Sequence, residues 1–152
     1  MLQRSQTLFL LGAFILSLFL MTGPITLFTL EGSEFALRHT GLFDSGGNKL
    51  GLATWPLSAI FIVVTFLAFL NIFFYRHRMR QMRIAIFLIL LNAGTLGMMF
   101  FYTFMSRNEL QGALTLHQWR FIVPPINMVF LYFAFRRIRR DELLVKAFDR
   151  IR

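Results

Sequence analysis

The polar side chains that could do chemistry in this chain are few, and several of them lie inside long apolar segments. Asn92 and Asn127 are the main examples, and counting about 1.5 Å of helix rise per residue from the basic segment ends places both about 12 Å deep. Asn71 lies only about 6 Å deep by the same count. With two hydroxyls slightly deeper, they make up a candidate polar intramembrane layer of Asn92, Asn127, Ser17 and Thr65.

Two interpretations of this layer remain open. Amide and hydroxyl side chains at one level bond neighbouring helices together, at about 0.6 to 2 kcal/mol for each hydrogen bond. The same groups could instead bind a polar substrate or a lipid headgroup. Helix packing is favoured, because no ionisable side chain stands near that level in the sequence and small residues such as Ala93, Gly94 and Gly97 favour close helix approach.

Acid–base or metal chemistry has little support. The residues outside the apolar segments that could act as an acid or a base are Glu34, His39, Asp44, Glu109 and His117. Their spacing matches no recognisable catalytic motif. No HExxH-like run is present, and the chain has no cysteine. We therefore expect neither an enzyme nor a protein with a catalytic, metal or cofactor site.

Four apolar segments must position these groups. The chain of 152 residues is 57% hydrophobic and contains 20 phenylalanines, and its mean hydropathy is +0.63. A membrane-spanning helix needs roughly 20 apolar residues. The sequence therefore predicts an all-α integral membrane protein, a single domain of four transmembrane helices over about 7–30, 55–75, 84–105 and 116–135.

The segments between these helices predict smaller elements. Residues 31–54 alternate apolar and polar positions around the turn-rich DSGGNK, which predicts a short β-hairpin-like outer loop. Thr115 and Gln118 have the spacing of a capping box at the start of the fourth helix. Pro124 and Pro125 would then lie inside that helix and kink it.

Basic residues predict the orientation, since loops rich in Lys and Arg stay in the cytoplasm. Twelve of the sixteen basic residues fall on one side of the predicted helices: Arg4, Arg76, Arg78, Arg80, Arg83, Arg136, Arg137, Arg139, Arg140, Lys146, Arg150 and Arg152. The other side carries Arg38, Lys49, Arg107 and Arg120. We expect a multi-pass protein with both termini in the cytoplasm.

The basic face is also a candidate contact surface. Its candidate lipid or partner contacts are Arg76, Arg78, Arg80, Arg83, Arg136, Arg137, Arg139 and Arg140. Residues 136–152 predict an amphipathic cytoplasmic helix, whose apolar stripe is Leu144, Phe148 and Ile151. It would lie on anionic lipid or on the turn between Arg76 and Arg83. A purely topological role, in which the arginines hold the helices in register, is favoured over dedicated lipid or partner recognition.

The two ends of the chain carry sequence signatures. The opening MLQRSQTLFLL and the closing DELLVKAFDRIR resemble those of the bacterial membrane-protein family catalogued as domain of unknown function 4293, typical of Bacteroidetes. The matching residues are Gln3, Arg4, Gln6, Thr7, Asp141, Glu142, Leu144, Val145, Asp149, Arg150 and Arg152. The resemblance implies an inner-membrane location and four helices but no activity. Since both signatures fall on the cytoplasmic face, we hypothesise a contact between Arg4 and Asp149.

These observations favour a non-enzymatic accessory or scaffold subunit of a larger membrane assembly. The alternative is a small oligomeric transporter or lipid-binding membrane protein built around the level of Asn92 and Asn127. A membrane enzyme at the outer loop is the third class. The expected partners are the lipid bilayer, with anionic lipids at the cytoplasmic face, and other membrane subunits or further copies of the chain, with no nucleic acid.

Overall fold

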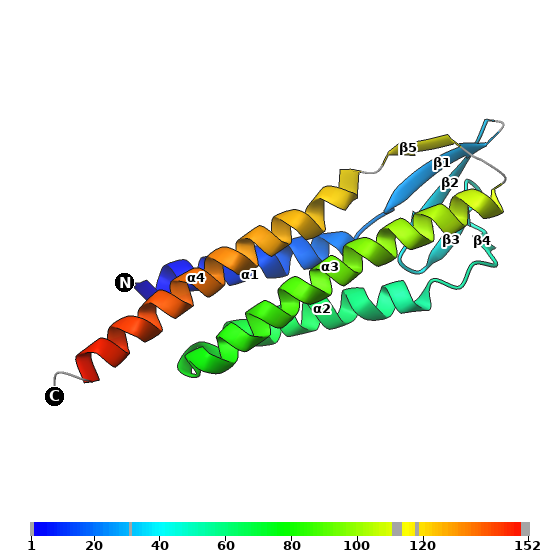
Figure 1. Ribbon diagram of the computed structural model, residues 1–152. Coiled ribbons are helices and arrows are strands. Elements are labelled where there is room, and N and C mark those ends of the chain that lie inside the picture. The colour runs from blue at the N-terminus through cyan, green and yellow to red at the C-terminus, as the bar shows by residue number, and fades with distance from the viewer. Residues whose placement is uncertain (1, 31, 111–113, 118, 150–152) are drawn as a thin grey trace.

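The computed structural model describes residues 2–30, 32–110, 114–117 and 119–149, with the backbone alone at 2–6, 76, 115–117 and 145–149. Within this part of the chain the fold is mostly helical, with a small β-sheet at one end (Figure 1). Its α-helices are α1 (Leu2–Met21), α2 (Trp55–Phe73), α3 (Arg78–Glu109) and α4 (Val123–Asp149), and two 3₁₀ turns are η1 (Phe74–Arg76) and η2 (Trp119–Ile122). The strands are β1 (Thr26–Leu30), β2 (Ser33–Arg38), β3 (Gly41–Asp44), β4 (Lys49–Leu50) and β5 (Leu114–His117).

Helix length and composition agree with a membrane protein. Three segments are long and apolar enough to cross a membrane, namely Trp55–Phe73, Arg78–Glu109 and Trp119–Leu144, while Thr7–Met21 is a shorter apolar helix. At about 1.5 Å per residue, α3 extends over about 48 Å, which exceeds a hydrocarbon core of about 30 Å. The predicted helix at 55–75 coincides with α2, and the predicted helix at 84–105 coincides with the middle of α3.

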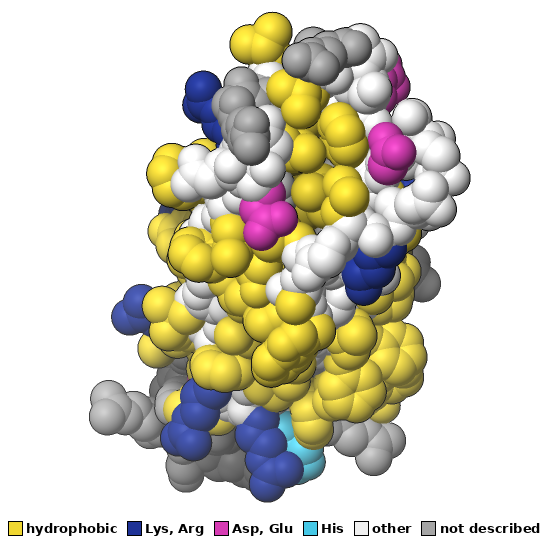
Figure 2. Space-filling model, turned by 90° about the vertical axis from the view of Figure 1, so that its right-hand side faces the viewer, with side chains coloured by type: hydrophobic (Ala, Val, Ile, Leu, Met, Phe, Trp, Pro, Cys, Tyr) yellow, Lys and Arg dark blue, Asp and Glu magenta, His cyan; other side chains and the backbone are white. Residues whose placement is uncertain are grey.

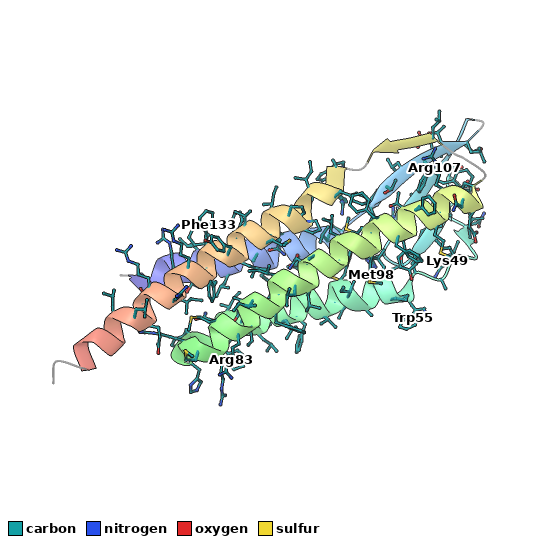
Figure 3. All side chains as sticks on the ribbon, in the orientation of Figure 1. Lys49, Trp55, Arg83, Met98, Arg107 and Phe133 are labelled. Carbon is teal, nitrogen blue, oxygen red and sulfur yellow. The ribbon has the colours of Figure 1, made fainter. Side chains whose placement is uncertain are left out.

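The helices run alternately up and down. Helix α1 packs against α2 and α4, and α3 packs against α2 and α4. Both marked chain ends lie at the end of the bundle that also holds the turn between α2 and α3, and the sheet lies at the opposite end (Figure 1). Arg83 lies at the end with the turn between α2 and α3, and Lys49 and Trp55 lie at the end with the sheet (Figure 3).

The predicted first helix, 7–30, is wrong in its second half. Helix α1 ends at Met21, and Thr26–Leu30 forms β1, which lies between β2 and β5 in the sheet. Proline at position 24 lacks the backbone donor that a helix needs, and the threonines and phenylalanine of TLFTL are residues that strands favour. A strand buried against a core is as apolar as a membrane helix, so hydropathy alone does not show where the helix ends and the strand begins.

In place of the predicted short hairpin in the outer loop, the structure has a five-stranded sheet. Five antiparallel strands are ordered β4-β3-β2-β1-β5. The predicted DSGGNK turn joins β3 to β4, where the backbone N–H of Gly47 donates to the Asp44 carbonyl at 2.8 Å. Gly47 has a φ of 76°, a conformation that residues with a side chain rarely adopt.

The predicted start of the fourth helix is also wrong. Thr115 pairs with Phe28 in β5 and does not cap a helix, while Gln118 lies outside the described residues. Pro124 and Pro125 stand in the first turn of α4. Backbone N–H groups there have no partner within the helix, so proline costs no hydrogen bond and no kink follows.

The predicted tail helix, 136–152, continues α4, which runs unbroken to Asp149, and residues 150–152 lie outside the described part of the chain. Leu144 is 46% exposed. The side chain of Phe148 and all of Ile151 lie outside what the structure describes, so the proposed apolar stripe is visible only at Leu144.

Two clusters form the core. One joins the inner face of the sheet to the adjacent helix ends, where Phe28 and Leu37 pack with Phe61 and Met99. The other fills the bundle, and it contains Leu10, Ala13, Val64, Ala68, Leu88, Leu131 and Ala134. Thr26 and Thr103 add a hydroxyl–hydroxyl hydrogen bond of 3.1 Å between β1 and α3. The sheet is therefore packed directly on the bundle.

Candidate functional site

Three members of the candidate polar layer meet in the middle of the bundle. The Asn127 Nδ2 group of α4 donates to Ser17 Oγ of α1 at 2.9 Å and to Asn92 Oδ1 of α3 at 3.1 Å. All three residues are at least 99% buried. Three helices are thus joined by one amide group.

The rest of this network is satisfied by helix backbone. Asn92 Nδ2 donates to the Leu88 carbonyl at 2.8 Å, and Ser17 Oγ donates to the Ala13 carbonyl at 2.9 Å. The single proton of Ser17 Oγ is used in this way and the amide oxygen Asn92 Oδ1 carries no proton, so both oxygens accept from Asn127. Asn127 Oδ1 is buried without a hydrogen-bond partner among the described residues. Such a network joins helices strongly and has one acceptor left over.

Thr65 does not join this network. Its hydroxyl faces Met21 Sδ at 3.8 Å, and it lines an apolar groove of about 340 Å³ between α1 and α2. The other lining residues are Phe14, Met21, Ile62, Phe66 and Phe69. Phe66 is 58% exposed, so the groove lies at the lateral surface of the bundle.

Asn71 is a second buried amide, closer to the basic end. Its side chain is fully buried, and neither its oxygen nor its nitrogen has a hydrogen-bond partner in the part of the chain described. Its backbone carbonyl accepts from Gln81 Nε2 at 3.2 Å. Gln81 therefore ties the start of α3 to the end of α2.

The sequence prediction missed the structural role of Arg120, which it placed at a helix edge. The residue is only 7% exposed. Its Nη1 donates to the Phe19 carbonyl at 2.9 Å, and its guanidinium lies 4.8 Å from the ring of Phe19 and 5.2 Å from that of Trp119. The same carbonyl accepts from the backbone N–H and from Oγ1 of Thr22, at 3.3 and 2.9 Å. Carbonyls in the last turn of a helix carry partial negative charge, so Arg120 and Thr22 together cap the end of α1.

His39 is a second polar contact that sequence reasoning did not find. Its Nε2 donates to the Met21 carbonyl at 3.1 Å, since a carbonyl only accepts. The backbone carbonyl of His39 accepts from Ser58 Oγ at 2.6 Å and from Thr54 Oγ1 at 3.0 Å. This residue therefore joins the turn after β2 to the end of α1 and to the start of α2.

The arginines predicted to contact lipid or a partner lie at the end opposite the sheet. Arg80, Arg83, Arg136, Arg139 and Arg140 are exposed. Arg78 Nη1 donates to the Asp141 carbonyl at 3.3 Å, and Arg137 lies 5.2 Å from the ring of Phe9. The side chains of Arg4, Arg76 and Asp149 are outside the described set, so the hypothesised contact between Arg4 and Asp149 cannot be placed.

No acid–base cluster is formed by the outer-face candidates that can be located. His39 is occupied by the contacts above, and Asp44 accepts from the backbone N–H of Ser45 at 2.7 Å. Across the described residues, no three His, Asp or Glu side chains are close enough to hold a metal ion. The described polar chemistry is thus hydrogen bonding between elements.

Comparison with protein families gives a match over nearly the whole chain. The model of the domain of unknown function DUF4293 matches residues 2–151. The chain belongs to this family. The predicted resemblance to this family is confirmed, and the match includes the β-strands and both terminal signatures except Met1 and Arg152. No curated protein and no solved structure matches the chain significantly.

Proposed function

We propose that this member of the family is a multi-pass protein of a bacterial inner membrane and a non-enzymatic accessory or scaffold subunit of a larger membrane assembly. In this proposal all four helices cross the membrane, both termini lie in the cytoplasm, and the sheet lies outside. The distribution of basic residues supports this orientation, because most of the described ones belong to the start of α3 and to the second half of α4, at the end of the bundle opposite the sheet.

The flanks of the bundle support contact with lipid or with other membrane helices. Hydrophobic side chains cover most of the middle of the visible face, and acidic side chains lie in its upper half (Figure 2). Large exposed side chains come from several helices, among them Ile15, Phe66, Phe73, Phe87, Leu90, Phe101, Phe104 and Tyr132. Such a surface is stable only in an apolar environment.

The single observation that carries the accessory role is the sheet, in which β4 and β5 are the edge strands among the described residues. Strands β4 and β5 each pair on one side only. An unpaired strand edge offers backbone donors and acceptors to another chain. The sheet is held to the bundle through Thr26, His39 and the shared core, so it presents these edges in a fixed position.

Purification at native abundance in mild detergent, with mass spectrometry of what remains bound, tests this proposal. Leu114 begins β5 and is 72% exposed, so Leu114→Lys places a charge on one edge. Leu143→Lys is the matched control, since Leu143 is 58% exposed at the other end of the molecule. We expect stoichiometric partner proteins that are lost only in Leu114→Lys. Partners equally retained by both variants, or none in the wild type, would contradict the proposed role of this edge.

A second candidate, a lipid-binding protein, is favoured by the groove between α1 and α2. Its apolar lining suits an acyl chain. Ile62→Trp would fill the groove, and native mass spectrometry of the purified protein should then show less retained lipid than the wild type. Equal lipid retention would exclude this groove as the binding site.

A further inference from the structure

Two cations of the sheet, Arg38 and Lys49, come together over Gly41. Arg38 stands directly opposite Gly41 in the register of β2 and β3, and residues opposite each other in an antiparallel pair have Cβ positions about 5 Å apart. A Cβ atom built on Gly41 would lie 2.5 Å from Lys49 Cε, so the lysine chain crosses directly over this glycine. Arg38 and Lys49 are therefore neighbours, with a residue between them that has no side chain of its own.

These cations lie on the face of the sheet that points away from the core, here called the open face. Leu37 and Leu42 are buried on the other face, and successive residues of a strand point to opposite faces. Arg38 and Lys49 are both exposed. The Arg38 guanidinium lies 5.9 Å from the ring of Phe43, which stands opposite Lys49. A ligand outside the protein can therefore reach both cations.

No carboxylate among the described residues neutralises this pair, since neither Arg38 nor Lys49 forms an ion pair there. Glu34 shares the open face, but it stands four residues from Arg38 along β2, about 13 Å away at the usual rise of a strand. The Asp44 carboxylate accepts from the backbone N–H and the hydroxyl of Ser45, within its own turn. Two neighbouring cations without a counter-charge favour an oxyanion, which accepts N–H bonds from both.

An exposed tryptophan belongs to the same neighbourhood. Thr54 Oγ1 donates to the His39 carbonyl at 3.0 Å. The residue after this donor is Trp55, and the residue before this acceptor is Arg38. Trp55 is 73% exposed, and it shares a face of α2 with the exposed Phe66, because eleven residues make about three helical turns. Tryptophan is typical of the boundary between lipid headgroups and acyl chains, so the matching ligand carries both an anionic group and a hydrocarbon chain.

We propose that Arg38 and Lys49 together bind the phosphate of an anionic phospholipid in the leaflet on the sheet side of the membrane. The acyl chains of this lipid lie along the face of α2 that begins at Trp55. Lys49 and Trp55 both lie at the sheet end of the molecule (Figure 3), so this site is separate from the arginines at the other end. The inference rests on the membrane placement proposed above but not on the accessory role.

Fluorescence of Trp55 gives a measurement confined to this site. The chain contains two tryptophans, so Trp119→Phe leaves Trp55 as the single emitter in the purified full chain. Phosphatidylglycerol with brominated acyl chains is the probe, added to neutral detergent micelles, because bromine quenches tryptophan only at close contact. Brominated phosphatidylcholine is the neutral comparison, and inorganic phosphate at constant ionic strength is the competing free anion.

The variants are made in this single-tryptophan background. Lys49→Gln removes one cation from the exposed edge strand, and Lys49→Arg keeps the charge. Arg107→Gln is the matched control, because Arg107 is an exposed cation at the same end but belongs to α3 and not to the sheet.

We expect brominated phosphatidylglycerol to quench Trp55 at a lower lipid fraction than brominated phosphatidylcholine does. The apparent affinity for phosphatidylglycerol should fall about fivefold in Lys49→Gln and again in Arg38→Gln, as expected for the attraction of one basic residue to anionic lipid. It should change less than about twofold in Lys49→Arg and in Arg107→Gln. The double variant Arg38→Gln/Lys49→Gln should no longer distinguish the two lipids.

A preference for phosphatidylglycerol that persists in the double variant would overturn the proposal. Displacement of the lipid by inorganic phosphate at equal concentration would also overturn it, since the site would then take the free anion. A protein that co-purifies with the wild type and is lost from Lys49→Gln, with unchanged lipid preference, would assign the cations to an acidic protein partner instead. Micelles impose no orientation, so failure of this site is distinguishable from failure of the proposed membrane topology, which thiol labelling in cells measures.

Discussion

The guanidinium of Arg120 occupies the space in which any side chain at Gly23 would begin. A Cβ atom built on Gly23 would collide with Arg120 Nη2 and lie 3.0 Å from its Cζ. Glycine at this position therefore lets the cation reach the end of α1, where it bonds to the Phe19 carbonyl. Residues nearly a hundred positions apart thus form one helix cap.

Gly23→Ala should therefore destabilise the protein. The added methyl group displaces Arg120, and its buried guanidinium loses the bond to the Phe19 carbonyl, at a cost of about 1 to 3 kcal/mol. The carbonyl itself keeps its bonds from Thr22. Unfolding in mixed micelles measures the change. Gly97→Ala is the control, because a Cβ there meets no atom within 4 Å and alanine favours a helix by about 1 kcal/mol. Equal stability of the two variants would show that Arg120 does not need this space.

The three-helix network at Asn127 predicts coupled effects. Asn127→Leu removes the donor to both Asn92 and Ser17, and an interhelical hydrogen bond in a membrane is worth about 0.6 kcal/mol on average. We expect a loss of about 1 to 2 kcal/mol in the free energy of unfolding. The double variant Asn92→Leu/Asn127→Leu should lose less free energy of unfolding than the two single variants lose together. Each single variant already removes the bond between the two residues, so their sum counts that bond twice.

Thr65→Val provides the comparison for this network. Among the described residues, the hydrogen-bond partner of the Thr65 hydroxyl is a methionine sulfur at 3.8 Å, so a change within about 0.5 kcal/mol is expected for a replacement of nearly the same shape. A loss as large as that of Asn127→Leu would place Thr65 in the network after all. Strict additivity of Asn92→Leu and Asn127→Leu would exclude the bond between them.

His39→Ala should loosen the sheet and leave the bundle intact. The imidazole bond to the Met21 carbonyl and the contact with Ser58 are lost, so the turn between β2 and β3 is held less firmly. Hydrogen exchange should speed up at Leu37 and Leu42 while remaining slow at Phe61 and Val64. His77→Ala, an exposed histidine at the opposite end, should change neither region. Uniform acceleration in both regions of His39→Ala would instead indicate global destabilisation.

The parts of this structure that could be predicted are those set by regular helix geometry. Asn92 and Asn127 were placed at one depth by counting residues, and they lie 3.1 Å apart through their amides. Constant rise along a helix makes such counts reliable. The basic residues and the terminal signatures could likewise be read without any tertiary information.

The parts that could not be predicted depend on contacts between distant residues. The apolar stretch of β1 has no periodicity that separates it from a helix, and β5 is only four residues long. Its partner strand lies far away in the sequence, at Leu27–Thr29. The sequence places Arg120 at the edge of an apolar segment and does not show that it is buried, because its burial depends on Gly23 and on the end of α1. The glycine–proline pair at positions 23 and 24 was a signal for the end of that helix.

Cysteine labelling tests the central claim, a bundle that crosses the membrane with its sheet outside, most directly. The chain contains no cysteine, so Ser45→Cys in the exposed turn between β3 and β4 and Met79→Cys at the start of α3 each introduce a single thiol. In intact cells, a membrane-impermeant maleimide should label Ser45→Cys and should reach Met79→Cys only after the inner membrane is permeabilised. Labelling of Met79→Cys but not Ser45→Cys in intact cells, or equal labelling of both, would contradict the account.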